Sequence, residues 1–354
     1  MKKNKKNFFD KDLKVFSYTI LSSCVIVLSF YLIPVLVEFK NNNLTKSIEF
    51  TNKSKNNFKK VLEGKEIKKK LKTNEKINLK NLFEDVFKFN DLPSDTVRLS
   101  AATIDELFKD TNYTLKNVRK TKLVKPIKLS LLPEEMKKIE STKKRKNLFI
   151  KIVLPLILEE NNRIKFERKK LFTILNKNSN SKEEKKWLNL KFKQYGVLNN
   201  DLSTLKIRMD IVPVSLAIAQ AAKETGWGTS RFAIEGNALF GQWTWSGEGM
   251  KPAGSNSDDT HKVMKFKLLK ASVRAYQRNL NTHSSYKKFR LERAKLRDNG
   301  KEIQSLILAD YLDKYAETGV EYVKILKKII EQNNLEDFDD AKLLPMSIKL
   351  KSLI

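Results

Sequence analysis

A short run of small apolar residues that ends in an acid and a glycine-rich turn constrains the fold of this chain more than any other stretch. Residues 213–224 read PVSLAIAQAAKE, and residues 225–228 read TGWG. Ala217, Ala221 and Glu224 are spaced to share one face of a helix. The segment therefore predicts a helix whose final carboxyl, that of Glu224, points toward the core or a cleft, as its apolar face does.

The surroundings expected for Glu224 affect its chemistry. Apolar neighbours penalise the ionised carboxylate and raise its pKa, so the group can hold a proton near neutral pH. Alternatively, Glu224 is an exposed residue at a helix C-terminus, where the helix dipole disfavours negative charge. The spacing of the apolar residues favours the first interpretation and makes Glu224 a candidate general acid.

The rest of the pattern predicts a mainly α-helical domain with one small irregular or β lobe. Helical periodicity begins near Leu132 and continues through the segments 183–195, 202–209, 271–280, 286–297, 303–315 and 322–330. Pro155 interrupts a dense apolar block and is expected to kink or divide a helix. The glycines and proline after Gly241 predict a loop or small hairpin, and a lobe of that kind opposite helices makes a cleft.

The N-terminal region carries a long apolar run. Residues 15–37 hold no charge, and as a helix they span about 34 Å, enough for a hydrocarbon core of about 30 Å. Six lysines and two aspartates precede the run, so the positive-inside rule places the N-terminus in the cytoplasm. As an alternative, residues 21–24, LSSC, resemble the lipobox of bacterial lipoproteins, and Cys24 would then carry a lipid.

These signals divide the chain into five parts. We expect a cytoplasmic basic tail at 1–14, a single-pass transmembrane anchor at 15–37, and a basic stalk or linker at 38–128, where large apolar residues are few. The helical domain is expected at 129–335 and a C-terminal tail at 336–354. The protein would then reside in the inner membrane, with its domain facing the periplasm.

Composition limits the partners and the chemistry. The chain has 71 basic and 41 acidic residues, a net charge of +30, which favours an anionic partner such as a membrane surface or a cell-wall polymer. Only 12 basic residues are arginine, and the basic residues are spread along the whole chain, so nucleic-acid binding is not expected. With one cysteine and two histidines, neither a metal site nor a cofactor is expected.

Residues 219–243 resemble a known family. Their sequence, AQAAKETGWGTSRFAIEGNALFGQW, is similar to the AQAAxESGWGTSRFAxExNNLFGxW pattern of the Bax-like branch of the bacterial glucosaminidases. Segments 279–283, NLNTH, and 315–319, YAETG, also resemble this branch, and the resemblance runs from about residue 132 to 335. Thr225 replaces a serine and Ala238 an asparagine of the pattern, and neither change removes a group assigned to catalysis.

The resemblance implies a lysozyme-like helical fold and cleavage of the glycan strands of peptidoglycan. In that fold the glutamate at the helix end protonates the glycosidic oxygen, which assigns the general acid to Glu224. Glycosidases commonly use two carboxylates, and the second is expected on the irregular lobe. Asp259 is the first candidate and Glu248 the second, with Asp258 nearby. Assistance by the N-acetyl group of the substrate would make a fixed second acid unnecessary.

Sugar rings expose apolar faces that aromatic side chains can hold. The candidates for substrate binding are Trp227, Asn237, Phe240, Trp243, Tyr315 and Tyr322, with Trp245 as a further aromatic. Phe240 also fits core packing, whereas Trp243 and Tyr315 fit a cleft. His261 is expected either to position a carboxylate or to bond a backbone carbonyl. Glu235 is expected to brace the turn at Asn237.

Together these observations predict a membrane-anchored peptidoglycan hydrolase. As an endo-β-N-acetylglucosaminidase it would cut a β-1,4 link in the N-acetylglucosamine–N-acetylmuramic acid strand. A lytic transglycosylase or a muramidase acting on the same strand is an alternative, and so is an inactive wall-binding scaffold that keeps the cleft. The expected partners are peptidoglycan glycan strands and the inner membrane, and the sequence gives no indication of the oligomeric state.

Overall fold

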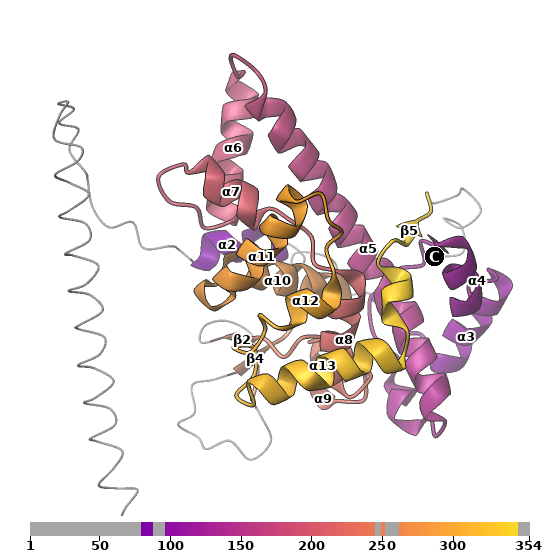
Figure 1. The fold of residues 1–354 in the computed structure, drawn as a ribbon. Coiled ribbons are helices and arrows are strands. Elements are labelled where there is room, and N and C mark those ends of the chain that lie inside the picture. Colours follow the sequence, from indigo (N-terminus) through magenta and orange to yellow (C-terminus); the bar gives the residue numbers. More distant parts are fainter. Residues whose placement is uncertain (1–78, 88–95, 245–248, 252–261, 346–354) are drawn as a thin grey trace, which may run out of the picture. The chain divides into compact units, whose positions relative to one another are not determined.

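The computed structural model describes residues 79–87, 96–244, 249–251 and 262–345. These residues are mainly helical, as predicted (Figure 1). The helices are α2 (Leu79–Phe87), α3 (Ala101–Asp110), α4 (Leu115–Thr121), α5 (Thr142–Leu175), α6 (Lys182–Gln194), α7 (Leu202–Arg208), α8 (Val214–Thr225), α9 (Arg231–Gly236), α10 (Leu269–Thr282), α11 (Lys287–Asp298), α12 (Ser305–Ala309) and α13 (Val320–Gln332). Short 3-10 turns lie at η2 (Glu134–Lys138), η3 (Ser284–Tyr286) and η4 (Leu335–Phe338).

Helix α8 lies at the centre of the main hydrophobic core. Leu216, Ala217, Ile218 and Ala221 on this helix are fully buried, and α5, α12, α13 and η4 pack around it. A helix whose residues are mostly small and apolar packs inside a protein, because burial removes its apolar surface from water. The small side chains of its alanines also leave room for neighbouring helices. The predicted helix against the core is confirmed.

The N-terminus of α8 depends on a residue far along the chain. Pro213 precedes the helix and offers no side-chain acceptor, although the first N–H groups of a helix need one. The Asp339 carboxylate accepts hydrogen bonds from the backbone N–H of Ser215 at 2.8 Å and from its hydroxyl at 2.7 Å. The C-terminal segment of the body therefore caps the helix that carries Glu224.

Helix α5 continues without a break for 34 residues, although Pro155 lies inside it. The expectation that Pro155 divides this helix is wrong. Proline has no N–H, so the carbonyl oxygen of Lys151, four residues earlier, loses its helical donor. The Tyr113 hydroxyl donates to that carbonyl oxygen at 3.2 Å. A side chain from outside the helix thus replaces the missing donor.

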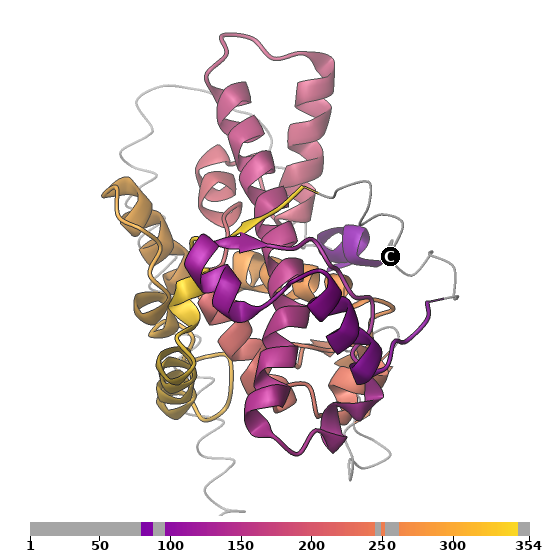
Figure 2. The same ribbon diagram turned by 90° about the vertical axis from the view of Figure 1, so that its right-hand side faces the viewer.

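The second half of α5 and the antiparallel α6 form a hairpin that extends from the rest of the helices (Figure 2). This hairpin has a small core of its own, which includes Leu171, Ile174, Leu188 and Phe192. Helix α6 begins with a capping box, in which Ser181 and Glu184 bond each other's backbone N–H groups. A local signal in the sequence therefore marks the start of this helix, while Leu205 and Met209 from the following segment complete the small core.

The helical body extends past both boundaries that the sequence indicates, 129 and 335. Ile104, Phe108 and Val118 on α3 and α4 are buried in the same core as α8, although the sequence assigns them to a linker. Strand β1 (Leu123–Val124) pairs in parallel with β5 (Lys342–Leu343). Residues from the predicted linker and the predicted tail therefore complete one core.

A small β lobe follows α9, as predicted. Strands β2 (Trp243–Thr244), β3 (Gly249–Met250) and β4 (Lys262–Met264) form an antiparallel sheet in the order β2-β4-β3. The segments that join these strands, 245–248 and 252–261, lie outside the described residues. The lobe connects the end of α9 to the start of α10.

None of the described helices is long and apolar enough to cross a membrane. The predicted tail and anchor at 1–37, with Cys24, lie outside the described residues. Residues 38–78 and 88–95 of the predicted stalk also lie outside the described residues.

Candidate active site

Glu224 is positioned by the last turn of α8 and by the turn that ends it. Gly226 and Trp227 both have left-handed backbone angles, with φ of 57° and 62°. The Thr225 hydroxyl donates to the carbonyl oxygen of Ala221 at 2.6 Å and accepts from the N–H of Gly228 at 2.9 Å. Threonine keeps the hydroxyl of the serine in the family pattern. The backbone on both sides of Glu224 is therefore fixed.

The carboxyl of Glu224 lies between α13 and the segment that follows α9. The Tyr322 hydroxyl donates to its Oε1 at 2.9 Å. Its Oε2 faces Gly241, where an added Cβ would come within 2.8 Å of that oxygen. Gly241 also has a φ of 59°, a conformation that glycine adopts without a steric penalty. The carboxyl therefore occupies the space that a side chain at position 241 would fill.

Burial raises the pKa of Glu224 above its usual range. The hydrogen bond from Tyr322 and the charge of Lys223 lower the pKa, and they offset only part of the effect of burial. The carboxyl therefore stays protonated to a higher pH than an exposed glutamate does. This is the property that a general acid needs near neutral pH.

A chain of hydrogen bonds orients the hydroxyl of Tyr322. Tyr276 donates to Oε1 of Gln220 at 2.7 Å, and Nε2 of Gln220 donates to the Tyr322 hydroxyl oxygen at 3.1 Å. Because that oxygen accepts from Gln220, its own hydrogen is available for Oε1 of Glu224. A proton on Glu224 therefore lies on Oε2, the oxygen that faces Gly241.

Tyr315 joins the Glu224 carboxyl to the loop beside it. Its ring stacks on Tyr322, with centroids 5.5 Å apart and 9° between the planes. Its hydroxyl donates to the carbonyl oxygen of Phe240 at 2.8 Å, which holds the residue before Gly241 in place. The ring centroid of Tyr286 lies 5.9 Å from that of Tyr315. Burial raises the pKa of Tyr286 to about 12. Both tyrosines are therefore neutral, and Tyr315 acts as a hydrogen-bond donor.

Trp227 is half-buried and lies on the turn after α8. It packs edge-on against Phe149, with centroids 5.9 Å apart, and the Lys146 ammonium lies 4.8 Å above its ring. The structure thus places Trp227 between α5 and the turn, with part of the side chain exposed. Its assignment to substrate binding stays a prediction.

Asn237 and Phe240 lie beneath the surface of the site. Asn237 is buried, and its Nδ2 donates to the backbone carbonyl oxygens of Phe266 and Lys267. Phe240 is buried as well and stacks on Tyr276, with centroids 3.8 Å apart. Both side chains fix the loop that carries Gly241, and Phe240 takes the core position that the sequence also allowed.

The candidates for the second carboxylate lie outside the described residues; they are Asp259, Glu248 and Asp258. Trp245 and His261 also lie outside the described residues, whereas Trp243 begins strand β2. Glu235 does not brace Asn237; it lies 3.7 Å from Arg231 in a surface ion pair. Across the described ranges, no group of three or more His, Cys, Asp or Glu residues could hold a metal ion.

Three residues that build the site were not predicted: Gln220, Gly241 and Tyr276. Gln220 precedes Glu224 by one helical turn, so the spacing alone places it on the same face. Gly241 is the last residue of the Leu-Phe-Gly segment, and a glycine can mark a position where another group comes close to the backbone. Tyr276 lies on α10, far from Glu224 in sequence, and no local pattern marks it.

Comparison with known proteins agrees with this geometry. The sequence profile of a family described as mannosyl-glycoprotein endo-beta-N-acetylglucosaminidase matches residues 200–335, which include Glu224, Gly241 and Tyr322. Protein bax of Escherichia coli (strain K12) is 33% identical over 212 residues, which cover 58% of this chain and 76% of that protein. The chain belongs to the glucosaminidase family. It is a Bax homologue and a glycoside hydrolase of the endo-β-N-acetylglucosaminidase class, as predicted.

The glucosaminidase is also similar to a solved structure, the catalytic domain of the autolysin Auto from Listeria monocytogenes. That match is 22% identical, covers 49% of this chain and 97% of the other, and has a TM-score of 0.29. With so low a TM-score, the family membership of the glucosaminidase rests on the sequence matches alone.

Proposed function

We propose that this glucosaminidase is a membrane-anchored peptidoglycan hydrolase with a lysozyme-like fold and with Glu224 as its general acid. The substrate is a β-1,4 bond in the N-acetylglucosamine–N-acetylmuramic acid strand. The observation that carries the proposal is the environment of Glu224: a half-buried carboxyl whose pKa is raised by burial, bonded by Tyr322 and facing Gly241. Other carboxyls in glycosidases work as acids for the same physical reason.

The proposed reaction begins with proton transfer from Oε2 of Glu224 to the glycosidic oxygen. The bond between that oxygen and the anomeric carbon breaks, and its electron pair stays with the leaving sugar. Either a water molecule or the N-acetyl oxygen of the substrate then bonds to the anomeric carbon, and water completes the hydrolysis. Asp259 first, and Glu248 second, are the candidates to assist this water.

Gly241 has a specific role in this proposal. Because residue 241 has no side chain, only its backbone lies in front of Oε2, the oxygen that carries the proton. Trp227, Trp243 and Tyr315 are the proposed contacts for sugar rings, whereas the ring of Tyr322, predicted from the sequence as a further contact, is buried. Tyr322 would hold the general acid in its reactive orientation.

The test is digestion of purified peptidoglycan by the full chain in detergent, beside Glu224→Gln, with fragments identified by mass spectrometry. General acids contribute about 10²–10⁴-fold to rate, so we expect Glu224→Gln to lose at least about 100-fold. Reducing N-acetylglucosamine ends support the proposal. Reducing N-acetylmuramic acid ends would identify a muramidase, anhydro-muramic ends a lytic transglycosylase, and binding without cleavage a scaffold.

We also propose that residues 15–37 anchor the protein in the inner membrane, with the helical body in the periplasm. The support is the uncharged run of residues and the lysines before it. Deletion of residues 1–37 should release the protein from membranes that retain the full chain after a carbonate wash. Protease added to the periplasm should degrade the body, and protection of the body would refute this orientation.

A further inference from the structure

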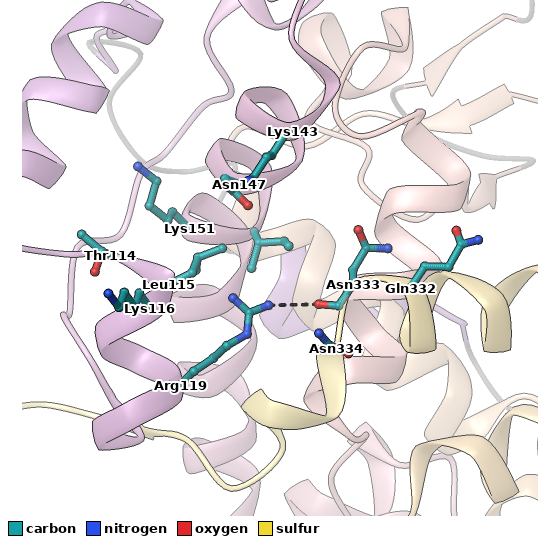
Figure 3. Close-up of a pocket in the computed structure, with 11 residues that line it drawn as sticks. Thr114, Leu115, Lys116, Arg119, Lys143, Asn147, Lys151, Gln332, Asn333 and Asn334 are labelled. Carbon is teal, nitrogen blue, oxygen red and sulfur yellow. Dashed lines mark hydrogen bonds between the residues drawn. The ribbon is translucent and has the colours of Figure 1, made fainter.

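A basic cavity lies between α4, the first half of α5 and the C-terminal end of α13 (Figure 3). Its volume is about 630 Å³, within the range of about 300–1,000 Å³ for pockets that bind small ligands. Four cationic side chains line it, those of Lys116, Arg119, Lys143 and Lys151, and no acid does. The residues assigned to catalysis are not among those that line it.

The acids around this cavity neutralise only part of its charge. Two of the four cations form ion pairs: Nε of Arg119 lies 3.0 Å from Oδ2 of Asp337, and Nζ of Lys151 lies 3.1 Å from Oδ1 of Asp105. Lys116 and Lys143 are exposed, and neither forms an ion pair or side-chain hydrogen bond with any residue that the structure describes. Two uncompensated lysines therefore border the same concave space, where an anion would be attracted to both.

Amide groups complete the lining, and one wall is held rigidly. The side chains of Asn147 and Gln332 border the cavity, and each offers both donors and an acceptor. The backbone carbonyl oxygen of Asn333 accepts from Arg119 at 3.0 Å, and its Oδ1 accepts from Lys146 at 3.3 Å. The wall formed by Asn333 is therefore ordered before any ligand arrives.

Lys146 connects this wall to the turn that carries the general acid. Its ammonium bonds Asn333 in the cavity wall and lies 4.8 Å above the ring of Trp227. Trp227 follows Glu224 by three residues. Lys146 therefore contacts both the wall of the basic cavity and the turn that follows Glu224.

We propose that the basic cavity binds a carboxylate of the peptide stems carried by the glycan strand, as a second contact for the substrate. This inference rests on the proposed function. The lysines supply charge for the carboxylate, and the amides supply hydrogen bonds for the peptide groups next to it. A neutral glycan would use the amides and leave Lys116 and Lys143 without an anion.

The test uses the full chain in detergent and the double variant Lys116→Gln/Lys143→Gln. The matched control is Lys185→Gln/Lys186→Gln on α6, which removes the same charge from exposed lysines away from the cavity. The substrates are native peptidoglycan and the same material with its carboxyls chemically amidated. We expect the double variant to raise KM on native substrate about tenfold over the control, with kcat unchanged. Wild type should show the same increase on amidated substrate.

Several outcomes would overturn the inference. One is a double variant with the same KM as the control. Another is a variant whose defect persists on amidated substrate, because the lysines would then act on an anion such as a phosphate. Sedimentation with intact peptidoglycan, with all variants also carrying Glu224→Gln, repeats the comparison without cleavage. If wild type cleaves nothing, the proposed function fails, and the sedimentation results still decide whether the cavity binds carboxylates.

Discussion

At the scale of single residues, the carboxyl of Glu224 lies between a hydrogen-bond donor, Tyr322, and a glycine, Gly241, which has no side chain. Tyr322 bonds Oε1 of Glu224, and Gly241 leaves Oε2 uncovered by any side chain of its own. Burial then raises the pKa of the carboxyl. The residues at positions 241 and 322 can be altered separately, and each gives its own prediction.

Gly241→Ala should impair catalysis more than it impairs stability. The new Cβ would lie 2.8 Å from Oε2 of Glu224, so the carboxyl must move, and we expect kcat to fall at least about tenfold. The left-handed backbone adds a strain of about 1–2 kcal/mol. Gly300→Ala is the matched control, because Gly300 has a φ of 65° and nothing within 4 Å of an added Cβ. Equal kcat values for the two variants would contradict this account.

Tyr322→Phe should shift the pH dependence of activity. The hydrogen bond from Tyr322 lowers the pKa of Glu224 against the larger effect of burial, so its removal raises that pKa further. A general acid works in its protonated form, and the alkaline limb of kcat/KM should therefore move to higher pH. The measurement is a pH–rate profile of both proteins, and a limb that moves to lower pH would show that Tyr322 acts otherwise.

At the scale of secondary-structure elements, several helices depend on side chains from distant segments. Helix α5 passes Pro155 because Tyr113 supplies a donor, and α8 begins where Asp339 accepts from Ser215. Neither contact follows from the residues of the helix itself. The long helices are therefore products of tertiary structure as much as of local propensity.

Tyr113→Phe should destabilise the protein through the carbonyl of Lys151. Loss of the hydroxyl leaves that carbonyl without a donor, at a cost of about 1–3 kcal/mol. In the double variant Tyr113→Phe/Pro155→Ala, the N–H of the alanine can bond the same carbonyl, so most of the loss should be recovered. Urea unfolding of the two single variants and the double variant measures this coupling. Simple additivity of the two changes would refute the pairing.

The parts of the fold that could be predicted from the sequence are those with local signals. The periodicity around Ala217, Ala221 and Glu224 placed the acid on a buried face, and the glycines after it indicated the turn. Tyr276 and Tyr322 come from α10 and α13, Tyr315 from the segment before α13, and only the fold brings Tyr276 near Gln220. The boundary at 129 was placed too late because α3 and α4 have short apolar patterns that need a partner to become a core.

At the scale of the whole molecule, segments from both ends of the helical body pack into its core. Segments from the predicted linker contribute Ile104, Phe108 and Val118 to the core, and β1 pairs with β5 near the C-terminal end of the described chain. The net charge of +30 favours an anionic surface as the setting for this body. The core of the body therefore includes residues on both sides of the stretch that the family profile matches.

A shortened protein that begins at residue 129 should fold poorly, and one that begins at residue 79 should fold. The first lacks Ile104, Phe108 and Val118, whose burial contributes about 1.5–3 kcal/mol each, against a typical total stability of about 5–15 kcal/mol. Thermal unfolding followed by circular dichroism compares the two proteins. Equal melting temperatures would mean that α3 and α4 are dispensable for folding.

The contact between Asp339 and α8 also bears on the order in which the parts of the site are synthesised. Asp339 lies 124 residues after Ser215, and β5 comes later still. A growing chain therefore contains Glu224 long before the ribosome has made the residue that caps its helix. Newly made protein therefore cannot complete the surroundings of Glu224 before Asp339 has been synthesised.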